Sequence, residues 1–84
     1  MILQGELGFS TVLALRKQGL NYIQQTEKPV FDLKAVNKAD SAGVALLLEW
    51  WRAAHQLQKP IQFLNIPSRM QALMKVSNVD EVLR

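Results

Sequence analysis

A junction in the middle of the chain constrains the fold most. The run from Val30 to Val36 is apolar enough for a strand, and the segment from Val44 to His55 has the apolar spacing of a helix. Asp40-Ser41-Ala42-Gly43 stands between them, where a helix begins with unpaired backbone N–H groups and an Asp or Ser commonly caps them. The junction therefore predicts a strand that leads through a short loop at Asn37-Lys38-Ala39 into a long helix.

Strand and helix patterns alternate along all 84 residues. Strands are expected over 2–7, 29–36 and 61–64, and helices over 11–25 and 41–57. A third helix opens at 65–68 and ends at Ser77-Asn78, and 79–84 forms a short helical turn or a tail. Its expected buried side is Met70, Leu73, Met74 and Val76. This order predicts one α/β domain over 1–84, built from βαβ units.

Composition excludes several classes of function. The net charge is +3, but the ten basic residues are scattered, whereas nucleic-acid binders gather them on one face. The chain has no cysteine, and its one histidine, His55, has no acidic residue at i±4, so no metal site is expected. No apolar stretch reaches the roughly 18 residues of a membrane span, and no signal peptide is visible. We expect a cytoplasmic protein without direct membrane insertion.

Nothing in the sequence supports catalysis. Ser41 and His55 lie 14 positions apart on one predicted helix, which separates them by about 21 Å and excludes a Ser–His pair. The glycines are dispersed, so no phosphate-binding loop is present, and Asp32 lies within a strand, where a structural role is expected. We therefore predict no catalytic residue, no cofactor and no enzymatic activity.

The second helix carries two apolar stripes when it is drawn at 100° per residue. The first is expected to pack on the sheet and consists of Leu46, Leu47, Trp50, Ala54 and Leu57. The second consists of Val44, Leu48, Trp51 and His55, with Ser41 at its N-terminal end. Ala45, Glu49, Arg52 and Gln56 form the polar face, where Glu49 and Arg52 are spaced to pair. The second stripe is either the margin of a wide core or a surface for a partner protein, since tryptophan is enriched in interface hot spots.

The order of these motifs resembles the core signature of STAS domains. The resemblance rests on Phe31-Asp32-Leu33, on Val36, and on the run from Asp40 to Leu48, and it extends to Gly5-Glu6-Leu7 and Asn65-Ile66-Pro67. It covers nearly the whole chain and implies a mixed β-sheet backed by helices. One departure is that STAS domains carry another strand before Gly5-Glu6-Leu7, and this chain starts too late to supply all of it. The sheet then has a bare edge, the start is misassigned, or a partner covers the gap.

The run from Asp40 to Leu48 is most similar to the MlaB-like subunit of bacterial phospholipid ABC transporters. This resemblance implies a non-catalytic subunit that binds and stabilises or regulates the ATPase. From the alignment of the second stripe with Ser41, we predict that the contact consists of Ser41, Val44, Leu48, Trp51 and His55. Asp40 would fix the loop, and Gly43 would let the partner backbone come close. Such a subunit would be peripheral to the inner membrane through the complex.

The same resemblance leaves a second function open. STAS domains include anti-sigma-factor antagonists, and Ser41 is placed as a candidate phosphoacceptor because a helix N-terminus favours an anion. The partners would then be an anti-sigma factor and a serine kinase. A small ligand beneath the second helix is a third reading, but no polar cluster in the sequence supports it.

Overall fold

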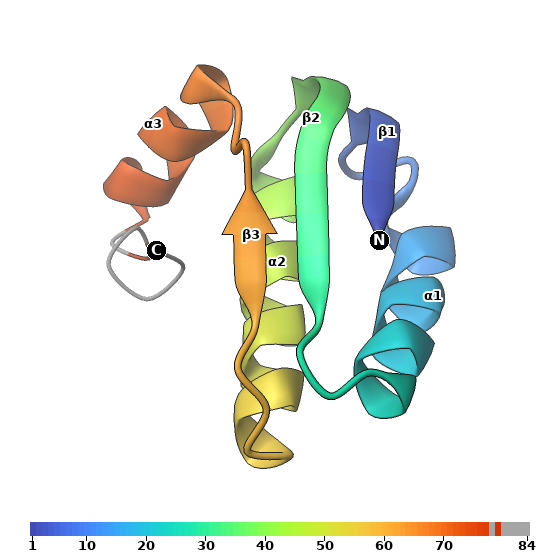
Figure 1. Cartoon of the computed structure of the whole chain (residues 1–84). Coiled ribbons are helices and arrows are strands. Elements are labelled where there is room, and N and C mark those ends of the chain that lie inside the picture. The colour runs from blue at the N-terminus through green and yellow to red at the C-terminus, as the bar shows by residue number, and fades with distance from the viewer. Residues whose placement is uncertain (78, 80–84) are drawn as a thin grey trace.

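Strands and helices alternate along the chain in the computed structural model, which describes residues 1–77 and 79 (Figure 1). The elements are β1 (Ile2–Leu7), α1 (Val12–Gln25), β2 (Val30–Ala39), α2 (Ser41–Gln56), β3 (Gln62–Leu64) and α3 (Ser68–Val76). The predicted α/β class is therefore confirmed. The segment 80–84, for which a helical turn or a tail was predicted, lies outside the described residues, as does Asn78.

The sheet has the order β1-β2-β3, and both of its pairings are parallel. The described residues thus form a parallel sheet, and not the mixed sheet that the resemblance implied. The reason is that each strand reaches the next through a helix, and a helical crossover joins parallel neighbours. Both crossovers step across the sheet in the same direction, so their common handedness places α1 and α2 on one face.

The central strand β2 is longer than its sequence suggested. It runs to Ala39, although Asn37-Lys38-Ala39 was expected to be a loop. The end of β1 explains the difference, because Glu6 pairs with Lys38 and Leu7 pairs with Ala39. Ladder hydrogen bonds hold three polar or small residues in a strand that their own propensities do not favour. The loop before α2 consequently shrinks to Asp40 alone.

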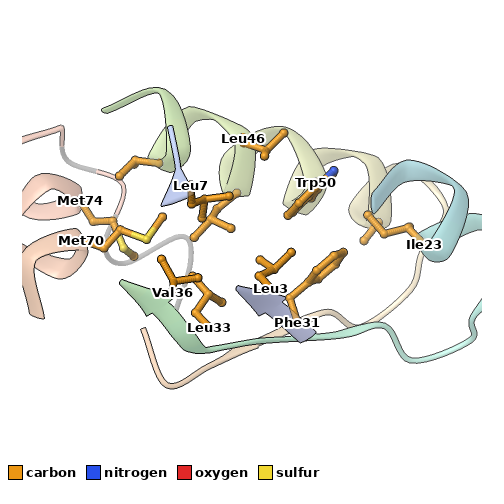
Figure 2. Close-up of a cluster of buried hydrophobic side chains, with 13 residues drawn as sticks. Leu3, Leu7, Ile23, Phe31, Leu33, Val36, Leu46, Trp50, Met70 and Met74 are labelled. Atoms are coloured by element: carbon orange, nitrogen blue, oxygen red, sulfur yellow. The ribbon is translucent and has the colours of Figure 1, made fainter. Parts of the chain in front are cut away.

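The core lies between the sheet and its helices, and Trp50 of α2 is its largest member (Figure 2). The indole stacks on the ring of Phe31 in β2, with centroids 4.5 Å apart and an interplanar angle of 9°. Its Nε1 donates to the backbone carbonyl of Arg16 at 3.3 Å. Gly19 faces the same indole, and a Cβ there would clash with it. The glycine in the middle of α1 thus permits a close approach of α1 to α2.

Two predicted core positions are wrong. Leu57 is exposed because α2 ends at Gln56 and the chain turns away. Val76 is 84% exposed, although Met70 and Met74 of the same helix are buried. Val76 follows Met74 by two positions, which is about 200° around a helix, so it points to the opposite side.

Candidate functional site

Asp40 joins the two segments that form the candidate site. As the N-cap of α2, its Oδ1 accepts hydrogen bonds from the backbone N–H groups of Ala42 at 2.8 Å and Gly43 at 3.3 Å. Its Oδ2 accepts from the backbone N–H of Phe9, in the turn between β1 and α1, at 3.1 Å. One carboxylate therefore fixes both the start of α2 and the neighbouring turn.

These hydrogen bonds also keep Asp40 ionised. The N–H of Phe9 is the main cause of a lowered pKa, and the N–H groups of Gly43 and Ala42 and the charge of Lys38 act in the same direction against the partial desolvation of the carboxyl. The negative charge of Asp40 thus stabilises the fold by interacting with the positive end of the α2 dipole.

Ser41 is the first residue of α2, and its side chain is exposed. Because Asp40 provides the cap, the Ser41 hydroxyl is not needed for it. Within the described part of the chain, no hydrogen bond of this hydroxyl is observed. The serine thus presents an accessible hydroxyl at a helix N-terminus, where added negative charge is favoured by the helix and opposed by Asp40 next to it.

Two glycines allow the turn, β1 and α2 to approach one another. A Cβ on Gly8 would lie 2.7 Å from Oδ2 of Asp40. A Cβ on Gly43 would fall well inside 3.0 Å of the backbone carbonyl oxygen of Leu7, a separation that real Cβ atoms essentially never show. The structure thus gives Gly43 an internal role, because it is buried and packs against the backbone of Leu7.

The second stripe of α2 divides between core and surface. Val44 is only 4% exposed and belongs to the core, so its predicted place in a partner surface is not supported. Leu48 and Trp51 are half-buried, and His55 is exposed. The rings of Trp51 and His55 stack, with centroids 4.8 Å apart and an interplanar angle of 11°. Accessible apolar surface therefore remains at Leu48 and Trp51, on the flank of α2.

A hollow adjoins the stacked pair at the C-terminal end of α2, lined also by Lys59, Pro60, Ile61 and Gln62. Along the helix axis, His55 is about 21 Å from Ser41 and Trp51 about 15 Å. The structure thus places the predicted contact residues on one helix without bringing them to a single point. Only an extended partner could touch both ends.

An apolar feature on the other flank of α2 was missed from the sequence. Phe9 and Leu13 are 84% and 82% exposed, and Leu13 lines a groove between α1 and α2. Leu13 could have indicated this feature from the sequence, because it is an apolar residue that does not share the helical spacing of the residues that α1 buries. Glu49, expected to pair with Arg52, instead accepts from Nε of Arg16 at 2.6 Å across this groove.

The described residues contain no group of three or more His, Cys, Asp or Glu side chains arranged to hold a metal ion. Asp32 and Asp40 do not form a pair. Asp32 accepts from the side-chain amide of Asn65 at 3.0 Å and from the backbone N–H of Lys34 at 2.9 Å, and these bonds lower its pKa. No helix in the described part of the chain is long and apolar enough to cross a membrane.

Comparison with solved structures gives the same fold. The anti-sigma-factor antagonist SpoIIAA in its unphosphorylated form matches with a TM-score of 0.78 and 21% identity, over 99% of this chain and 74% of that one. The Bacillus cell-fate determinant SpoIIAA in its phosphorylated form matches with a TM-score of 0.74 and 22% identity, over 99% and 77%. Among curated proteins, no sequence match was found. The family model described as "Mlab, STAS domain" matches residues 1–84, and the chain therefore belongs to the MlaB-type STAS-domain family.

Proposed function

We propose that this protein is a non-catalytic STAS subunit that binds and stabilises or regulates the ATPase of an Mla-type phospholipid ABC transporter. Membership of the MlaB-type family over residues 1–84 carries the proposal. The geometry of the α2 N-terminus supports it, because Asp40 holds Ser41 in an exposed, fixed position. A rigid contact surface loses less conformational entropy on binding than a mobile one. The protein would act in the cytoplasm, at the inner membrane through the complex.

The proposed contact begins at Ser41 and continues along the flank of α2 through Leu48 and Trp51 to His55. Val44 supports this surface from inside the core. Trp51 is the expected hot spot, since a half-buried indole offers a large apolar area at a low cost in side-chain entropy. Its stacking on His55 holds the ring in one orientation.

Binding of the co-expressed and purified ATPase subunit tests this surface. We expect Ser41→Asp and Trp51→Ala each to weaken binding about tenfold or more, the range of a hot-spot contact. Ser68→Asp is the matched control, because Ser68 is the exposed first residue of α3. Wild-type binding that neither Ser41→Asp nor Trp51→Ala reduces would refute the contact surface, and absence of wild-type binding would refute the function.

A second function is favoured by a specific observation. The fold matches SpoIIAA in both its unphosphorylated and its phosphorylated form, and Ser41 offers an exposed hydroxyl at the start of α2. The protein would then be an anti-sigma-factor antagonist that a serine kinase switches at Ser41. Intact mass after incubation with the cognate kinase and ATP tests this. One added phosphate on the wild type and none on Ser41→Ala supports the switch, and an unchanged wild-type mass counts against it.

A further inference from the structure

An apolar groove runs between the N-terminal halves of α1 and α2, with a volume of about 260 Å³. Val12 and Leu13 line it from α1, and Ala42 and Ala45 line it from α2. The Arg16–Glu49 ion pair also lines it and bridges the two helices. The groove lies on the opposite flank of α2 from Leu48 and Trp51, and Ala42 lines its end near the N-terminus of α2.

Two large apolar side chains, Leu13 and Phe9, are both more than four-fifths exposed. Leu13 lines the groove, and Phe9 lies in the turn that leads into α1. The N–H of Phe9 is held by Asp40, so its position is fixed relative to the start of α2. Grouped exposed apolar side chains next to a groove are typical of a contact site for another protein.

Charge indicates what kind of partner fits. Lys17 of α1 and Arg52 of α2 are both exposed, and the described residues hold no acidic partner within salt-bridge distance of either one. Arg16 and Glu49 neutralise each other, and neither α1 nor α2 has an acidic residue in its first turn. Asp40, at the N-cap of α2 beside Ala42, offsets only one of the two unpaired basic residues, so a small excess of positive charge remains around the groove.

We propose that the α1–α2 groove binds an amphipathic helix of the partner protein, with apolar residues on Phe9 and Leu13 and acidic residues facing Lys17 and Arg52. A groove between two helices accepts a third helix by its apolar face. A second copy of this chain fits poorly, because it carries the same net charge of +3 and offers no excess of acidic residues. The proposal rests on the proposed function, in which the partner is the transporter ATPase.

The position of Ser41 links the groove to regulation. Ser41 lies directly before Ala42 and one helical turn before Ala45, and both of these alanines line the groove. A phosphate on Ser41 would add a charge of about −1.5 to −2 close to where the acidic helix lies. Phosphorylation would thus weaken this contact by repulsion.

The test compares variants in binding to the purified ATPase subunit. Leu13→Glu is expected to weaken binding about tenfold or more. Val76→Glu, at an equally exposed apolar residue on α3, is the matched control and should bind like the wild type. Lys17→Glu should weaken binding more at low salt than at high salt, and Lys75→Glu on α3 should not. Leu13→Ala is a second variant that adds no charge and should also weaken binding.

The outcomes separate this proposal from the proposed function. If Ser41→Asp and Trp51→Ala abolish binding while the Leu13 and Lys17 variants bind like the wild type, the groove is refuted and the function stands. If the wild type does not bind the ATPase, both fail. A photo-crosslinker at position 13 should capture an acidic amphipathic segment of the ATPase, and capture of a basic segment would overturn the proposal. Sedimentation with anionic phospholipid vesicles that depends on Leu13 and Lys17, without ATPase binding, would assign the groove to a membrane instead.

Discussion

Replacement of Gly43 by alanine separates an internal role of this residue from a role in partner binding. In the interior of a helix, Gly→Ala normally stabilises by about 1 kcal/mol, and this is the largest gain that Gly43, in the first turn of α2, could show. At Gly43 the added Cβ meets the carbonyl oxygen of Leu7, a backbone atom in a core strand that cannot rotate away. The Cγ of Leu7, at 3.2 Å, blocks the same space. Either β1 or α2 must move by on the order of 1 Å to restore ordinary contact.

Overpacking of this kind costs typically about 1–3 kcal/mol. Because the obstacle is backbone, the upper end applies, and the gain in helix propensity leaves a net loss of about 2 kcal/mol. For a domain of this size, that loss lowers Tm by about 8–16 °C. Thermal and urea unfolding, followed by circular dichroism and tryptophan fluorescence, measures both quantities.

Ala45→Gly is the matched control, because Ala45 is exposed on the same helix and should lose only about 1 kcal/mol through helix propensity. A Gly43→Ala protein as stable as the wild type, or more stable, would refute the steric reasoning. If such a stable variant also failed to bind the ATPase, the close approach of a partner backbone to Gly43 would be the better explanation.

Three further predictions follow from the same contacts. Gly19→Ala should lower the free energy of unfolding by about 1–3 kcal/mol, because the added Cβ overpacks against the Trp50 indole. Most of this loss should disappear in a Trp50→Leu background, which a double-mutant cycle measured by urea unfolding checks. The pKa of Asp40 is lowered in the folded state, so the ionised carboxylate stabilises the fold above the unfolded pKa near 3.8, and this stabilisation is lost as pH falls through the lower folded pKa. The Tm values of the wild type and of Asp40→Asn should therefore converge between pH 5 and about pH 2.5. A difference in Tm that stays constant over this range would contradict the direction of the pKa shift. The exposed Arg16–Glu49 pair should show a coupling energy below about 1 kcal/mol in a double-mutant cycle, decreasing with added salt.

The order of elements was predictable because local patterns and tertiary packing agree there. Leu46, Leu47, Trp50 and Ala54 recur at helical spacing, and all four are buried against the sheet or α1. The end of β2 was not predictable, because Asn37-Lys38-Ala39 has no strand propensity of its own and is held by pairing with β1. The pairing joins residues that are more than 30 positions apart, and no local pattern in the sequence indicates it.

The candidate site was predictable in its centre and not at its edges. Asp40 and Ser41 stand out because a helix start has a local signature of capping residues. Val44 was assigned to the surface but is buried, because a helical wheel shows on which side of the helix a residue lies and not which element packs against that side. Phe9, Leu13 and Arg16 belong to α1 and its preceding turn. Only the packing of α1 beside α2 shows that Leu13 and Arg16 share a groove with residues of α2 and that the Phe9 N–H is bonded to Asp40.

Asp40 is the residue through which these separate segments act as one surface. Its carboxylate accepts hydrogen bonds from backbone N–H groups in the turn before α1 and at the start of α2. A displacement of either segment therefore alters the hydrogen bonds of the other. A phosphate on Ser41 would compete with Asp40 for the same N–H groups and would repel its charge. Release of the Phe9 N–H would then free the turn that carries an exposed aromatic side chain. Ser41→Glu should therefore increase hydrogen exchange at the Phe9 amide, and unchanged exchange there would mean that charge at Ser41 acts on a partner alone.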